Sequence, residues 1–163
     1  MRIVVLADTH IPDFARALPA GVIRALRRAD LILHAGDVTS AAVLRELGSY
    51  APVRAAVGNN DRPDVTAWGA TDEVRLVEGG VSIAMLHIGG PRGGRERRLR
   101  RRFPEAAVIV FGHSHIPWNE QVDGVHYFNP GSATWKRRQP APTYGVLDLD
   151  RGSVRARIID VAP

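Results

Sequence analysis

Five apolar segments of this 163-residue chain are each followed directly by side chains that can bind a metal ion. In chain order these side chains are Asp8 and His10, Asp37, Asn59, His87, and His113 with His115. One such residue alone would more commonly cap a turn or accept an ordinary hydrogen bond. Carboxylate, amide and imidazole groups repeated at five segment ends instead predict a metal site.

The spacing of these residues favours more than one ion. Asp8 and His10 lie two residues apart at the end of one segment, as do His113 and His115, so each pair can turn toward a common ion. Seven ligands exceed what one tetrahedral ion requires. If Asp37 bridges, two ions about 3.5 to 4 Å apart are satisfied, which is the separation used by two-metal phosphatases and nucleases.

The chain contains no cysteine, so the ligands must be nitrogen and oxygen atoms. Such a set suits Mn²⁺, Fe²⁺ or Zn²⁺. Gly36, Gly58 and Gly112 precede three of the ligands and permit sharp turns and close backbone approach where the segments end.

Alternating strands and helices must position these residues in the first third of the chain. The predicted elements are strands over Arg2–Ala7, Leu31–Leu33 and Val53–Val57 and helices over Ala20–Arg28 and Ser40–Leu47. Thr39 or Ser40 is the expected N-cap of the second helix, and Gly48 its stop signal. This βαβ order predicts a parallel sheet, with the metal ligands at the carboxyl ends of its strands.

Antiparallel pairing enters in the rest of the chain. The predicted elements are a hairpin of Val74–Val77 and Val81–Leu86, a helix over Arg95–Phe103, a strand over Val108–Phe111, a hairpin within Asn119–Phe128, and strands over Tyr144–Leu149 and Val154–Ile159. We expect one α/β domain over residues 1–163, built from mixed sheets.

Composition and apolar run lengths indicate the class of the protein and its expected location. The hydrophobic fraction of 45% and the charged fraction of 24% are typical of a globular domain. The longest apolar runs fall far short of the roughly 20 residues that a membrane span requires, and the start lacks the pattern of a signal peptide. We therefore expect no membrane association and a cytoplasmic location. The oligomeric state is left open, with an oligomer among the alternatives.

The ordered motifs resemble those of the calcineurin-like metallophosphoesterases. The matching residues are Asp8-Thr9-His10, Gly36-Asp37, Gly58-Asn59-Asn60-Asp61, His87 and Gly112-His113-Ser114-His115. The chain length and the stretch Phe128-Asn129-Pro130-Gly131-Ser132 are most similar to the compact bacterial and archaeal phosphodiesterase branch. This resemblance implies a four-layer α/β/β/α sandwich of two mixed β-sheets flanked by helices.

The resemblance also implies the division of the ligands and the reaction. Asp8, His10 and His115 would hold one ion, Asn59, His87 and His113 the other, and Asp37 would bridge them. We expect two divalent ions, with Mn²⁺ first and Fe²⁺, Zn²⁺ or Ni²⁺ as alternatives. The expected activity is that of a phosphodiesterase or phosphatase, in which a metal-bridging hydroxide attacks a small-molecule phosphoester in line.

Two positions depart from the family pattern. Asn60 stands where relatives often have His or Cys, and an amide cannot serve as an acid or base, so we expect it to position the substrate. Ile88 stands where relatives commonly have Gly after the His ligand, and Gly89 and Gly90 would supply flexibility one step later.

Several further features are expected to have structural roles. The segment Arg92–Arg102 holds seven arginines and one glutamate, which favours a solvated helix face over a nucleic-acid contact. His34 and His126 are expected to be structural or surface histidines, and Asp61 either orients a ligand or caps a turn.

Two other functions remain as alternatives to a small-molecule phosphodiesterase. They are nuclease activity on RNA or DNA and a non-catalytic protein-interaction scaffold of the same fold.

Overall fold

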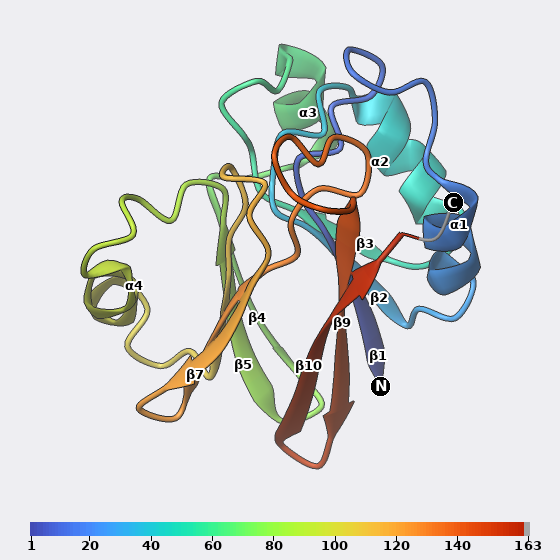
Figure 1. The fold of residues 1–163 in the computed structure, drawn as a ribbon. Helices are drawn as coiled ribbons and strands as arrows, with labels where there is room; N and C mark the ends of the chain where they lie inside the picture. The colour runs from blue at the N-terminus through green and yellow to red at the C-terminus, as the bar shows by residue number, and fades with distance from the viewer. Residues whose placement is uncertain (162–163) are drawn as a thin grey trace.

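The computed structural model describes residues 1–161, which fold around two five-stranded sheets (Figure 1). The first sheet has the strand order β10-β9-β1-β2-β3. Its strands are β1 (Arg2–Leu6), β2 (Leu31–His34), β3 (Val53–Ala55), β9 (Thr143–Asp150) and β10 (Ser153–Asp160). The pairs β1–β2 and β2–β3 are parallel, whereas β9 is antiparallel to both β1 and β10, so the sheet is mixed as predicted.

The second sheet has the order β4-β5-β6-β8-β7 and is also mixed. Its strands are β4 (Glu73–Glu78), β5 (Val81–Leu86), β6 (Val108–Val110), β7 (Trp118–Val122) and β8 (Val125–Asn129). The central strands β5, β6 and β8 are parallel, and the edge strands β4 and β7 pair antiparallel with their neighbours.

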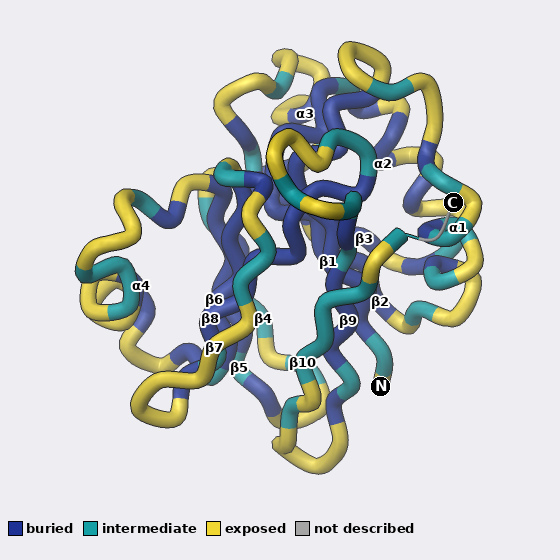
Figure 2. The backbone as a smooth tube through the Cα atoms, in the orientation of Figure 1, coloured by how far each residue is buried: buried dark blue, intermediate teal, exposed yellow. Residues whose placement is uncertain are grey.

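Three apolar cores separate four layers. The helices are α1 (Ala20–Leu26), α2 (Ala41–Gly48), α3 (Pro63–Trp68) and α4 (Arg95–Arg102). Alternation along β1 directs Val4 and Leu6 toward α1 and α2, while Ile3 and Val5 join the core between the two sheets. A third core packs α4 against the other face of the second sheet. The dark interior of Figure 2 follows these layers, which confirms the predicted α/β/β/α sandwich.

Among residues 1–161, α3 is the one helix that the sequence did not predict. It has six residues, of which Val65 alone is buried, so its apolar periodicity is too short to recognise. Its start does carry a signal, because Pro63 occupies the first turn, where a missing N–H costs nothing. The N-cap of α2 is Ser40, whose Oγ accepts a hydrogen bond from the backbone N of Ala42.

The topology brings the carboxyl ends of the parallel strands to one end of the molecule. The strands β1, β2 and β3 run in one direction in the first sheet, as do β5 and β6 in the second. The loops after these five strands carry all the predicted ligands. Among residues 1–161 no helix is long and apolar enough to cross a membrane.

Leu99 is expected to anchor α4, because it is only 3% exposed and packs into the third core. Leu99→Ala should lower the free energy of unfolding by about 2 to 5 kcal/mol, from lost transfer free energy and a residual cavity. Urea denaturation measures this loss. Arg101→Ala, an exposed position on the same helix, should change stability by less than about 0.5 kcal/mol. Equal losses in the two variants would contradict the packing described for this helix.

Candidate metal centre

The first group of predicted ligands is formed by Asp8, His10 and His115, whose ligand atoms lie within 4.8 Å of one another. The Nε2 atoms of His10 and His115 are 3.2 Å apart, and His115 Nε2 is 3.5 Å from Asp8 Oδ1. All three side chains are buried. Two turns that are about a hundred residues apart in the chain therefore present one compact set of nitrogen and oxygen atoms.

The second group is formed by Asp37, His87 and His113, whose ligand atoms also lie within 4.8 Å of one another. Asn59 joins this group, with its Oδ1 atom 3.1 Å from His87 Nε2. His113 and Asn59 are exposed, so this group is the more open of the two.

The carboxylate of Asp37 lies between the two groups. Its Oδ2 atom is 3.7 Å from Nε2 of His10 in the first group and 3.3 Å from Nε2 of His87 in the second. One oxygen atom therefore faces both sets of ligands, which is the position that the sequence predicts for a bridging carboxylate.

Backbone carbonyls orient two of the imidazole rings. His87 Nδ1 donates a hydrogen bond of 2.7 Å to the carbonyl of Ala35, and His115 Nδ1 donates one of 2.7 Å to the carbonyl of Trp135. A neutral ring with Nδ1 as the donor presents the lone pair of Nε2 to the centre, which is the form that binds a metal ion.

Five of the ligands have left-handed backbone conformations. The φ angles are 53° at Asp8, 46° at His10, 56° at Asp37, 69° at His113 and 58° at His115. Each such residue costs about 1 to 3 kcal/mol unless its surroundings enforce the conformation. Their concentration at one site indicates that the fold maintains strain there to aim these side chains inward.

Hydrogen bonds from the backbone to Asp61 help to hold these loop conformations. Its carboxylate accepts hydrogen bonds from the backbone N–H groups of Gly58 at 2.7 Å, Thr39 at 2.6 Å and Asp37 at 3.2 Å. It thereby fixes the loops after β2 and β3 relative to each other. Of the two roles considered from the sequence, the contacts favour the orientation of neighbouring ligands.

The end of β8 and the segment after it form hydrogen bonds with the loops after β1 and β6. Ser132 Oγ donates to the carbonyl of Asp8 at 2.7 Å, and Thr134 Oγ1 donates to the carbonyl of Thr9 at 2.7 Å. Asn129 Nδ2 donates to the carbonyl of Gly112. In the sequence Asn129 and Ser132 stood out only through family resemblance, and Thr134 did not stand out, because an isolated small polar residue has no periodicity to mark it.

The electrostatics of the centre suit divalent cations. Burial raises the pKa of Asp8 to about 7, and its Oδ2 atom has no hydrogen-bond partner among the described residues. Burial lowers the pKa of His115 to about 4, so this ring is neutral at pH 7. At Asp37 burial acts to raise the pKa, but hydrogen bonds from His87 and Asn60 hold it below its ordinary value. At His87 burial acts to lower the pKa, but the Asp37 carboxylate raises it above its ordinary value. Imidazoles with buried carboxylate oxygens fit a metal centre, because a cation satisfies those oxygens.

The two departures from the family pattern lie at the opening. The Asn60 backbone N–H and side-chain amide donate to the two Asp37 oxygens at 2.8 and 2.7 Å, so Asn60 contacts the bridging position directly. Ile88 is 49% exposed, and Gly90, two residues after it, has a left-handed φ of 76°. His87 still points into the centre.

Two histidines lie outside both ligand groups, as predicted. His34 is fully buried, and its Nε2 lies 3.0 Å from the hydroxyl oxygen of Thr9, which places it behind the first loop. His126 is half-buried on β8, and burial lowers its pKa.

The arginine-rich segment makes several contacts within the protein. Arg95 donates to the carbonyl of Gly90, and Arg98 donates to the carbonyl of Gly93. Arg102 pairs with Glu73. The bonds to Gly90 and Gly93 tie the loop after His87 to α4, and the pair with Glu73 ties α4 to β4, so part of the segment has a structural role.

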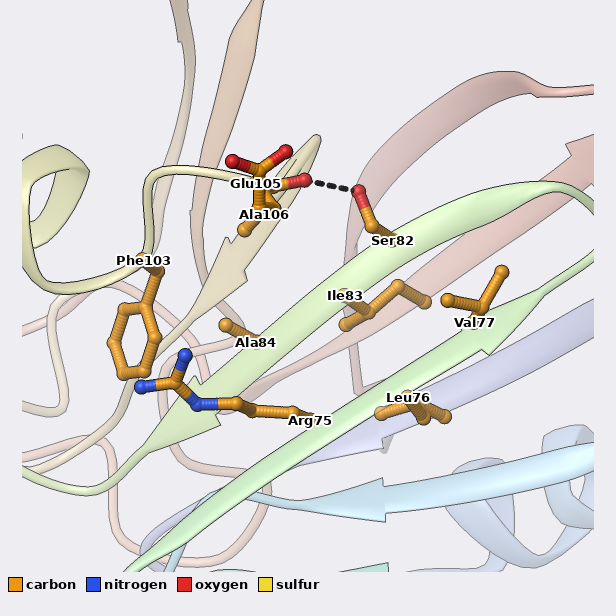
Figure 3. A pocket seen from close by; sticks show the side chains of 9 residues that line it. All are labelled: Arg75, Leu76, Val77, Ser82, Ile83, Ala84, Phe103, Glu105 and Ala106. Carbon is orange, nitrogen blue, oxygen red and sulfur yellow. Dashed lines mark hydrogen bonds between the residues drawn. The ribbon is translucent and has the colours of Figure 1, made fainter.

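A separate pocket of about 400 Å³ lies between β4, β5 and the end of α4 (Figure 3). Its lining is mostly apolar and includes Leu76, Ile83 and Phe103, with the Arg75 guanidinium 4.8 Å from the Phe103 ring. None of the nine residues that line it is a predicted ligand. It is therefore distinct from the metal centre.

Comparison with known proteins identifies the family. A family model of the calcineurin-like phosphoesterase superfamily domain matches residues 1–152. The chain is 38% identical over 163 residues to a probable metallophosphoesterase of Methanothermobacter thermautotrophicus, covering 98% of this chain and 92% of the relative. The chain belongs to the calcineurin-like phosphoesterase superfamily.

One further curated relative and one solved structure are similar to this chain. Phosphodiesterase MJ0936 of Methanocaldococcus jannaschii is 26% identical over 170 residues, covering 98% of this chain and all of that protein (100%). A mutant of Vps29 from Entamoeba histolytica has a TM-score of 0.78 at 22% identity, covering 98% of this chain and 99% of that one. The second likeness is one of fold alone.

Gly58 is expected to tolerate no side chain, because a Cβ atom there would overlap the backbone N and carboxylate of Asp37. Gly58→Ala should therefore displace the loop and lower the free energy of unfolding by about 1 to 3 kcal/mol, as overpacking does elsewhere. Gly48→Ala is the matched control, since a Cβ atom at Gly48 meets nothing within 4 Å. Chemical denaturation and amide NMR shifts around Asp37 measure the effect. Two variants with indistinguishable spectra at Asp37 would contradict the close approach.

Proposed function

We propose that this protein is a metal-dependent phosphodiesterase with two divalent ions, in which hydroxide attacks phosphorus in line. The observation that carries the proposal is the position of Asp37 Oδ2 between His10 of one ligand group and His87 of the other. Family membership supports a hydrolase of phosphoesters. Mn²⁺ is our first choice of ion, with Fe²⁺, Zn²⁺ and Ni²⁺ as alternatives.

The ligand groups divide between the two ions. Asp8, His10 and His115 would hold one, and Asn59, His87 and His113 would hold the other, with Asp37 shared. When bound, the ions would lower the pKa of a water molecule and stabilise the negative charge that develops on the phosphoryl oxygens. The ligand atoms of the first group lie within 4.8 Å of one another, which supports this division.

The protein's own residues would supply orientation and charge balance. Ala35 and Trp135 hold the His87 and His115 rings through their carbonyls, so the geometry exists before substrate arrives. His113 and Asn60 are exposed at the opening, where they would contact the phosphoryl group. To do so, the Asn60 amide would exchange its bond with Asp37 for one with a phosphoryl oxygen.

Experiments can distinguish two alternative functions from this proposal. A scaffold of the same fold would bind partners without hydrolysis, and the seven intact ligand positions favour an enzyme over it. A nuclease would share the chemistry and differ in substrate, and it rests on the exposed arginines of Arg92–Arg102. A substrate panel with bis(p-nitrophenyl) phosphate, p-nitrophenyl phosphate and a single-stranded oligonucleotide distinguishes them.

Asp37→Asn should remove the shared negative charge and with it at least one of the two ions. Loss of a residue that merely supports a ligand reduces activity 10- to 100-fold, so loss of this ligand should reduce kcat/KM for bis(p-nitrophenyl) phosphate by more than about 100-fold. Elemental analysis after loading with Mn²⁺ and steady-state kinetics measure both effects.

Asp123→Asn is the control for that substitution, because it makes the same change in an exposed turn between β7 and β8. It should retain both ions and full activity. Wild-type protein that binds only trace divalent metal, or an Asp37→Asn variant with unchanged metal content, would refute the two-ion proposal.

The amide at Asn60 indicates a second property, which is weak protonation of the leaving group. An amide donates no acidic proton, so kcat/KM should fall steeply as the pKa of the leaving alcohol or phenol rises. Asn60→His should flatten this dependence by raising rates on poor leaving groups. A series of aryl methyl phosphates measures the slope. A shallow slope in wild type, together with a pH profile that requires a protonated acid, would count against this assignment.

A further inference from the structure

An aromatic pair borders the first ligand group. The rings of Phe14 and Trp135 are stacked, with centroids 3.9 Å apart and planes at 9°. The Trp135 ring lies edge-on to two predicted ligands, 5.4 Å from the His10 ring and 5.0 Å from the His115 ring. The Phe14 ring is also 5.5 Å from His10. The pair therefore lies directly beside the metal centre.

Phe14 leaves a large aromatic surface uncovered at this position. It is 58% exposed although one of its faces lies against Trp135. Three of the six large apolar side chains that are exposed among the described residues lie within four positions of a predicted ligand, namely Phe14, Ile88 and Ile116. Exposed apolar groups gathered around a polar centre are typical of a binding site.

Arg137 adds a cation to the same border. Its guanidinium carbon is 4.6 Å from the centre of the Trp135 ring, and its backbone is left-handed, with a φ of 50°. Arg137 is exposed, and within residues 1–161 its side chain forms no hydrogen bond or ion pair. The Trp135 ring beneath this guanidinium is itself 5.0 Å from the His115 ring, so Arg137 lies beside the first ligand group.

We propose that Phe14, Trp135 and Arg137 form a subsite that binds the esterifying group of a phosphate ester, and that this group carries a planar aromatic ring. The inference rests on the proposed phosphoesterase function and specifies its substrate class. The ring of the substrate would stack on the open face of Phe14. Arg137 would bind a non-bridging phosphoryl oxygen, which guanidinium groups recognise through paired hydrogen bonds.

The parts of this subsite support one another. Trp135 contacts Phe14 and Arg137, and its carbonyl fixes the His115 ring, so a substrate ring held on Phe14 has a defined place relative to the centre. Stacking of a base or aryl ring on an aromatic side chain contributes about 1 to 3 kcal/mol, and it tolerates different rings because each has a π-face. Both nucleotide esters and simple aryl esters satisfy this chemistry.

Binding of non-hydrolysable probes tests the subsite without relying on turnover. Calorimetry on the Mn²⁺-loaded protein compares phenylphosphonate with methylphosphonate, which share the phosphonate group and differ in the ring. Phenylphosphonate should bind about 10-fold more tightly. Phe14→Ala should reduce this ratio to near one, and Phe14→Tyr should preserve it. Arg137→Gln should weaken both probes about equally.

Val77→Ala is the control, since Val77 is 70% exposed on β4, away from the centre, and its loss should leave the ratio unchanged. The phosphonate analogue of adenosine 5′-monophosphate identifies the source of the ring: tighter binding than phenylphosphonate indicates a nucleotide ester, and equal binding an aryl ester. A wild-type ratio near one, or a ratio that survives Phe14→Ala, overturns the subsite. Hydrolysis of bis(2,2,2-trifluoroethyl) phosphate, followed by fluorine NMR, reports separately on the phosphoesterase, since this probe has no ring. Its loss in wild type would overturn the proposed function, whereas its retention with a binding ratio near one would overturn the subsite alone.

Discussion

The burial of carboxylate oxygens among imidazole rings is the constraint on which the rest of this structure depends. Asp8 and Asp37 bring negative charge into a place that water scarcely reaches, and Asp8 Oδ2 has no donor among the described residues. Such an arrangement is costly for a protein alone and favourable for one that holds cations. The left-handed ligand residues, the glycines beneath them and the carbonyls behind the histidine rings all maintain it.

The four-layer fold stabilises this arrangement of buried carboxylates. Two mixed sheets each contribute parallel strands whose carboxyl ends meet at one end of the molecule, so short loops can deliver ligands from five strands. Apolar cores pack against both faces of each sheet and hold those strands in place. Asp61 and the segment after β8 then lock the loops to one another. The strain at the centre is balanced by packing and hydrogen bonds elsewhere.

Much of this arrangement could be predicted from the sequence. Apolar runs that end in Asp, Asn or His mark both a buried strand and the edge at which its ligand lies, so strand positions and the convergence of the ligands were predictable together. The helix α3 was missed, because six residues with a single buried side chain give no periodic pattern. The Phe14–Trp135 pair was missed for another reason. Stacking depends on the path of two loops far apart in the chain, and no local spacing encodes it.

The central claim is that two ions share the Asp37 carboxylate. Anomalous diffraction from crystals loaded with Mn²⁺ tests it most directly, because it locates each ion without reference to activity. We predict two anomalous peaks about 3.5 to 4 Å apart with Asp37 between them. One peak would be beside Asp8, His10 and His115, and the other beside Asn59, His87 and His113. A single peak, or two peaks that do not share Asp37, would contradict the account.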